Sequence, residues 1–143
     1  MSSPFIHLRV SSEFSISRGL LRVNEIVENA KKLGMPAVAL TDLNNMFGMV
    51  KFFKKAEAEG IKPIAGTVFN LKSQNGELGE ILCLAKNNIG FKALMRIISK
   101  SQLEQENNII SVTFDDLKSS AGDIVVLAGG PLSNIFNLAK NNK

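Results

Sequence analysis

The 143-residue sequence has little of what builds a metal or redox centre. It contains one histidine, His7, and one cysteine, Cys83. Several imidazole or thiolate ligands for zinc or a similar metal therefore cannot be assembled. A lone cysteine also excludes an intrachain disulfide, and its position in the apolar run 81–85 predicts that Cys83 packs in the core.

Long apolar runs are missing as well. No run approaches the roughly 20 residues that span a bilayer, and the first residues lack the basic-then-apolar pattern of a signal peptide. We therefore expect a cytoplasmic protein without membrane attachment. Charged residues make up 21% of the chain and are spread along it rather than grouped in runs, which argues against a disordered tail or a coiled coil. The formal net charge of +4 permits weak attraction to nucleic acid without demonstrating it.

What the sequence does contain is an alternation of strand-like and helix-like segments. Apolar patterning predicts strands over 5–10, 37–40, 62–71, 80–85 and 123–128. Helical spacing predicts helices over 23–33, 46–59, 91–98 and 131–141, and a capping pattern at Thr113 predicts a short helix to residue 119. This order predicts an α/β fold with a mainly parallel sheet or barrel. An open Rossmann-like sheet is the competing architecture, but the first strand-to-helix turn lacks G-x-G-x-x-G.

Few residues near the predicted strand ends are of a catalytic type. Asp42 is the one acid directly after a strand, where α/β proteins place their chemistry. A Ser-His-Asp arrangement could be drawn from Ser11 or Ser12, His7 and Asp42, because such triads are defined by geometry. Serine-rich turns more often satisfy local backbone donors. We expect His7 to be a hydrogen-bonded structural residue on the polar face of the first strand.

Two further patterns have both a functional and a structural interpretation. The lysine pairs at 31–32 and 54–55 could touch phosphates, but a solvated helix face explains them better. Phe52 and Phe53 could stack on single-stranded bases, yet their helical spacing favours core burial for at least one of them. Neither pattern requires nucleic-acid binding.

Specific segments go further than periodicity. The runs 5–15 with Gly19, 34–42, 45–48 and 60–66, continued by 84–91 and 125–130, closely resemble one known family. It is the polymerase-and-histidinol-phosphatase (PHP) domain that begins the bacterial replicative DNA polymerase III α subunit. The resemblance implies part of a PHP-type distorted (β/α)7 TIM-like barrel, incomplete in a chain of this length. It also implies that residues 1–143 are the N-terminal portion of that domain in a larger polymerase subunit.

The resemblance also implies where active members hold metal ions, and this sequence departs from them. The matching positions are Arg9, Ser11, Arg18, Asp42, Leu43, Val68 and Glu80, and of these only Asp42 retains its type. We therefore expect a vestigial site with no catalytic residue, metal or cofactor. Arginines at positions 9 and 18 would place fixed positive charge where cations sit in active members. We expect them to form an internal network with the carboxylates of Asp42 and Glu80.

Three functions follow as hypotheses. The first is a non-catalytic structural and interaction module of the polymerase, bound to other holoenzyme subunits and docking the proofreading exonuclease, with DNA met through the parent polymerase. The second is a metal-dependent phosphoesterase, either a 3'-5' exonuclease or a pyrophosphatase. The third is a plain DNA-binding module. An incomplete barrel leaves a sheet edge and apolar helix faces uncovered, so we also expect self-association.

Overall fold

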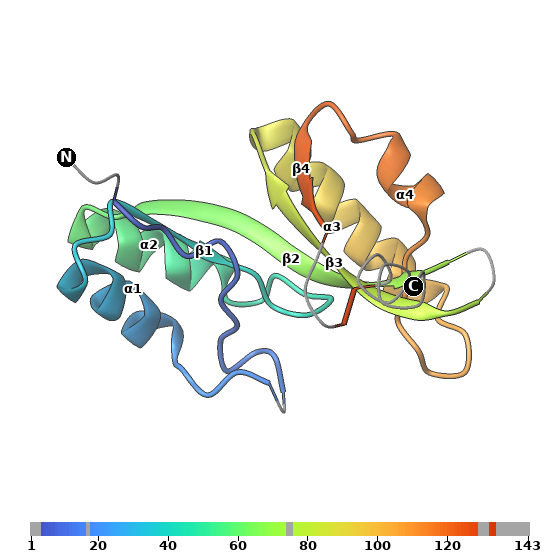
Figure 1. Ribbon diagram of the computed structural model, residues 1–143, viewed down its shortest axis with the longest axis horizontal. Helices are drawn as coiled ribbons and strands as arrows, with labels where there is room; N and C mark the ends of the chain where they lie inside the picture. The colour runs from blue at the N-terminus through green and yellow to red at the C-terminus, as the bar shows by residue number, and fades with distance from the viewer. Residues whose placement is uncertain (1–3, 17, 74–75, 129–131, 134–143) are drawn as a thin grey trace, which may run out of the picture.

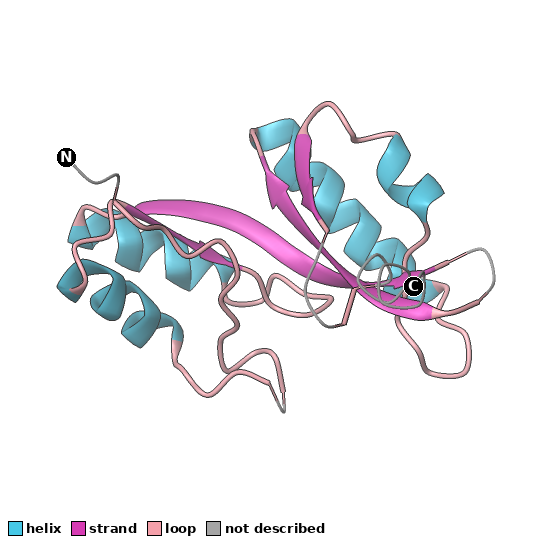
Figure 2. Cartoon of the chain, in the orientation of Figure 1, coloured by secondary structure: helices cyan, strands magenta, loops and turns pink. Residues whose placement is uncertain are grey.

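The computed structural model describes residues 4–16, 18–73, 76–128 and 132–133. Helices and strands within these residues alternate along most of the chain, as Figures 1 and 2 show. Their order is α1 (Val23–Lys32), β1 (Ala37–Leu40), α2 (Met49–Glu59), β2 (Lys62–Lys72), β3 (Leu78–Ala85), α3 (Asn88–Leu103), α4 (Phe114–Lys118) and β4 (Ile124–Leu127).

Local signals place the first two helices close to their predicted ranges. The Glu25 carboxylate accepts a hydrogen bond from the Arg22 backbone N–H at the start of α1. Gly60 ends α2 in the left-handed conformation at a φ of 71°, which glycine adopts without a steric cost. Helix α2 begins three residues later than predicted. The Asn45 side chain accepts from the Phe47 N–H and holds the residues before Met49 in a turn.

The sheet has the order β1-β2-β3-β4. Strands β1 and β2 are parallel, but β3 is antiparallel to β2, and β4 is antiparallel to β3. The prediction of a mainly parallel sheet is therefore wrong for this part of the fold. Only residues 73–77 separate β2 from β3, and the Ser73 N–H donates to the Glu77 carbonyl at 2.9 Å. Parallel neighbours would need a crossover of a dozen or more residues.

The two ends of the predicted strand series also differ from expectation. Residues 5–10 form no regular strand, although the carbonyls of His7 and Val10 accept from Ala39 and Thr41 of the β1 segment. Leu8, which a strand over 5–10 would place on the face opposite His7, is exposed. Strand β4 has the predicted place, but only Ile124 is buried, and no described strand pairs with its outer edge. The predicted turn at 129–130 and the predicted helix over 131–141 lie outside the described residues, apart from 132 and 133.

Buried apolar side chains form two main clusters joined by the long, curved β2 strand (Figure 1). One cluster lies between α1, α2 and β1, with Phe52 fully buried. The other lies between α3, β3 and the second half of β2, and includes Phe69 and Cys83. Core packing of Cys83 is thus confirmed, and burial raises the pKa of its thiol to about 12. Burial of at least one residue of the phenylalanine pair is confirmed by Phe52.

Helix α3 extends beyond the predicted range 91–98 at both ends, while the predictions for α4 and for the helix lysines are confirmed. Thr113 caps α4 by accepting from the Asp116 N–H, while Asp116 accepts from the Thr113 N–H in return. Lys31 and Lys55 lie on helix surfaces, where they form ion pairs with glutamates of α1 and α2. None of the helices in the described ranges is both long and apolar enough to cross a bilayer.

Candidate functional site

Asp42 lies directly beyond β1 and is almost completely buried, with 1% of its surface exposed. Its Oδ1 accepts from the Ser12 backbone N–H at 2.7 Å and from Ser15 Oγ at 2.6 Å, and its Oδ2 accepts from Ser12 Oγ at 2.7 Å. The backbone carbonyl of Asp42 accepts from Thr67 Oγ1 at 2.8 Å. Three donors to one carboxylate satisfy a charge that would otherwise be costly to bury.

The loop between residues 11 and 21 brings both serines to Asp42. Residues 12 and 21 pair across its ends, and the Glu13 N–H donates to the Leu21 carbonyl at 2.9 Å. At Gly19 the backbone approaches itself so closely that an added Cβ would lie 1.8 Å from the Ser12 carbonyl oxygen. The loop therefore requires glycine at this position, and its path fixes where the serine hydroxyls point.

Glu80 forms the second polar centre. It lies in β3 with its side chain 6% exposed, and each of its two carboxylate oxygens forms a salt bridge with one arginine. Arg9 comes from the segment beside β1 and donates to Oε2, while Arg18 comes from the loop and donates to Oε1. Both arginine side chains are more than 40% exposed. The cluster thus joins one buried negative charge to two cations at the surface.

The predicted Arg–carboxylate network is therefore present around Glu80, but its extension to Asp42 is wrong. The carboxylate oxygens of Asp42 receive serine donors rather than arginines. Sequence reasoning assigned the serine-rich turn to local backbone contacts and missed Ser12 and Ser15 as partners of the buried acid. Several serines just before Gly19 were the one sequence signal for such contacts. Which acceptor their hydroxyls reach depends on the path of the folded loop.

The other positions implied by the resemblance carry no metal-ligating side chain. Leu43 and Val68 form a parallel backbone bridge, and the Leu43 N–H donates to Ser15 Oγ at 3.0 Å. Ser11 is half-buried and precedes Ser12 in the loop. The structure thus places these seven positions in the segment before α1, directly after β1, in the middle of β2 and near the start of β3, in separate groups rather than in one cluster.

The donor set does not fit the metal ions that the resemblance implies. Among the described residues no three histidine, cysteine, aspartate or glutamate side chains come together in a group suited to a metal ion. Glu80 already meets two guanidinium groups, whose fixed charge opposes a nearby cation. His7 is exposed and its ring packs edge-on against Phe5 with centroids 4.8 Å apart. Ser12 donates directly to Asp42, so no imidazole is interposed as in a Ser-His-Asp triad.

Comparisons with known proteins identify a family model and several relatives of the chain. The family model for the PHP domain matches residues 7–143. A DNA polymerase III subunit alpha from Vibrio cholerae is 43% identical, with 100% of this chain and 13% of the relative covered. The corresponding subunit from Escherichia coli O6:H1 is 45% identical, with 71% of this chain and 9% of the relative covered. The chain thus spans only a small part of these relatives.

Among solved structures, one protein from Bifidobacterium adolescentis is named as a metal-dependent phosphoesterase. It aligns with a TM-score of 0.58 and 18% sequence identity, covering 71% of this chain and 34% of that chain. At this identity the likeness concerns the fold alone. It supports the predicted fold class, a PHP-type α/β barrel that is incomplete, since the sheet of the described residues does not close.

Proposed function

Because the chain belongs to the PHP domain family, we propose that it acts as a non-catalytic structural and interaction module of a replicative DNA polymerase. The observation that carries this proposal is the Arg9–Glu80–Arg18 cluster. Arg9, Arg18 and Glu80 occupy three positions that the resemblance assigns to metal ligands, and here both arginines form salt bridges with Glu80. Such a cluster can link the N-terminal segment, the loop and β3 without a bound cation.

The polymerase context rests on the relatives named as DNA polymerase III subunit alpha. The proposed module is the N-terminal portion, residues 1–143, of the PHP domain in such a subunit. Its proposed partners are other subunits of the holoenzyme, including the proofreading exonuclease, and DNA reached through the polymerase. A cytoplasmic location follows from that role.

The phosphoesterase alternative requires a metal centre, so metal uptake and turnover decide between the two. The purified chain is equilibrated with Zn²⁺ and Mn²⁺, desalted, and measured both for metal content and for hydrolysis of an aryl phosphate. We expect substoichiometric metal and no turnover above the blank, while a zinc phosphatase taken through the same steps retains metal and activity. Stoichiometric metal together with turnover would replace this proposal with the phosphoesterase.

The DNA-binding alternative is tested separately by fluorescence anisotropy with labelled single-stranded DNA. A module that contacts DNA only through the rest of a polymerase should show weak binding that disappears as salt is raised. Tight binding at physiological salt that depends on particular surface lysines would favour a DNA-binding module instead.

A further inference from the structure

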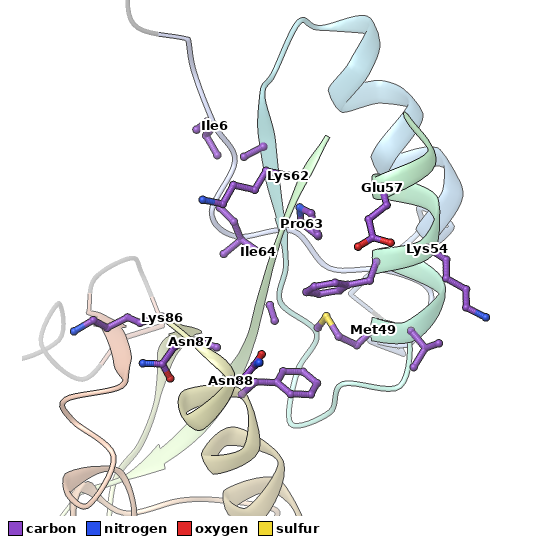
Figure 3. Close-up of a pocket in the computed structure, with 16 residues that line it drawn as sticks. Ile6, Met49, Lys54, Glu57, Lys62, Pro63, Ile64, Lys86, Asn87 and Asn88 are labelled. Carbon is purple, nitrogen blue, oxygen red and sulfur yellow. The ribbon is translucent and has the colours of Figure 1, made fainter. Parts of the chain in front are cut away.

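A groove of about 670 Å³ lies beside β2, between α2 and the start of α3 (Figure 3). Its walls are mainly apolar: Met49, Val50 and Phe53 come from α2, Ile64 from β2 and Phe91 from α3. The volume lies within the range of about 300–1,000 Å³ that is usual for ligand pockets. The groove shares no residue with the Arg9–Glu80–Arg18 cluster, so it is a separate feature of the surface.

The rim of the groove carries an excess of positive charge. Lys54, Lys62 and Lys86 line it together with a single acid, Glu57. Lys62 and Lys86 lie on the opposite side of the groove from Lys54 and Glu57 (Figure 3). Within the described ranges, the ammonium groups of Lys54 and Lys62 have no ion pair. Lys86 donates to the Gly122 carbonyl at 2.7 Å, which leaves its charge uncompensated.

We infer that this groove docks a segment of a partner protein in which a bulky apolar side chain is flanked by carboxylates. The apolar walls would bury the anchor, and the surrounding lysines would pair with the acids. Val50 is 71% exposed in α2, a large apolar exposure that a docked segment would cover. This inference rests on the proposed role as an interaction module and adds the surface and the chemistry of the partner.

Charge decides among the possible occupants. In a symmetric pair built on this groove, the lysine-rich rims of the two copies would face each other and repel, which disfavours a second copy at this site. Nucleic acid could pair its phosphates with the lysines, but the aliphatic walls made by Met49, Val50 and Ile64 offer its bases no stacking surface. An acidic segment with an apolar anchor matches both the walls and the rim.

The test selects random phage-displayed peptides on the full chain and measures the affinity of the enriched peptides by anisotropy. We expect enriched peptides that combine leucine or phenylalanine with aspartate or glutamate. Val50→Asp and the double variant Lys54→Glu/Lys62→Glu should each weaken binding about tenfold or more. All three side chains are exposed, so these variants should fold normally. The matched control Lys32→Glu/Lys118→Glu makes the same change in net charge on exposed lysines elsewhere and should bind as the wild type does.

Several outcomes would overturn the inference. One is that no peptide is enriched on the wild type more than on Val50→Asp. Another is that the enriched peptides are basic. A third is that the Lys32→Glu/Lys118→Glu control loses as much binding as the groove variants. Self-association that Val50→Asp abolishes would assign the groove to a second copy. The metal assay of the proposed function tests the region around Glu80, whereas peptide selection tests the groove. A contradiction of the proposed function can therefore be told apart from a contradiction of this inference.

Discussion

At the scale of single residues, Glu80 has the environment most sensitive to substitution. Its carboxylate is buried, while Arg9 and Arg18 reach it from two different segments. Either arginine alone can still neutralise the buried charge. Loss of both leaves a buried carboxylate without a cationic neighbour, which costs much more than the loss of an exposed pair.

We therefore predict strongly non-additive effects at this cluster. Arg9→Ala and Arg18→Ala should each lower the free energy of unfolding by about 1 kcal/mol or less, and the double variant by about 3 kcal/mol. Adding Glu80→Gln to the double variant should restore part of the loss, because the orphaned charge is removed. Urea denaturation measures all four variants. Strictly additive single effects, or a further loss with Glu80→Gln, would contradict this account.

Asp42 provides a second residue-scale prediction. Its carboxylate accepts three hydrogen bonds from Ser12 and Ser15. Asp42→Asn replaces one of the two accepting oxygens by an amide donor, which then faces at least one of these donors, so it should lower the free energy of unfolding by about 1–3 kcal/mol. Thermal or urea unfolding gives the value. The control Asp115→Asn, at an exposed position in α4, should stay within about 0.5 kcal/mol of the wild type.

The sequence predicted these residues unevenly, for a physical reason. Arg9, Arg18 and Glu80 could be paired in advance because the resemblance places all three at the positions of one metal site, where the arginines supply the positive charge that a carboxylate needs. The partners of Asp42 could not be predicted, because a serine hydroxyl can form a hydrogen bond either within its own turn or to a residue far away in the sequence. Only the folded path of the loop, with its close approach at Gly19, decides between the two.

At the scale of elements, the contact between α1 and α2 depends on pH. Hydrogen bonds from Lys31 and then Lys55, with their charges, lower the pKa of Glu59 to about 2 from an ordinary value of 4.5. A lowered folded-state pKa contributes stability above pH 4.5 that disappears as the pH falls through about 2.

Glu59→Gln should therefore flatten the acid side of the stability curve. We expect the wild type to lose more stability than the variant between pH 4.5 and about 2, with little difference in slope at higher pH. Thermal unfolding across that pH window measures the effect, and 1 M salt should reduce it because these groups are at the surface. Parallel curves for the two proteins would show that Glu59 does not contribute.

The elements themselves were largely predictable, but strand direction was not fully read from the sequence. Helical spacing and the glycines after α1 and α2 marked the helices well. Only residues 73–77 separate β2 from β3, and so short a connection already requires the two strands to be antiparallel. The apolar residues of β4 mark a strand, but the exposure of their side chains depends on which elements cover the two faces of the sheet.

At the scale of the whole molecule, the sheet ends in an apolar edge. Val125, Val126 and Leu127 of β4 are consecutive and each at least 37% exposed. Within the described part of the chain β4 pairs only with β3, so its other edge offers backbone donors and acceptors. Exposed apolar edge strands pair with other chains unless charges or covering elements prevent it.

We predict that the chain associates through β4 as its concentration rises, and that Val126→Lys reduces this association. A lysine on the edge strand costs desolvation when two edges pair. Light scattering after size exclusion gives the mass at several concentrations. The control Leu33→Lys replaces an apolar side chain that is 68% exposed after α1, so it should associate as the wild type does. Higher salt should strengthen association by screening the net charge of +4. A mass that stays monomeric, or falls equally in both variants, would show that the β4 edge is not the contact.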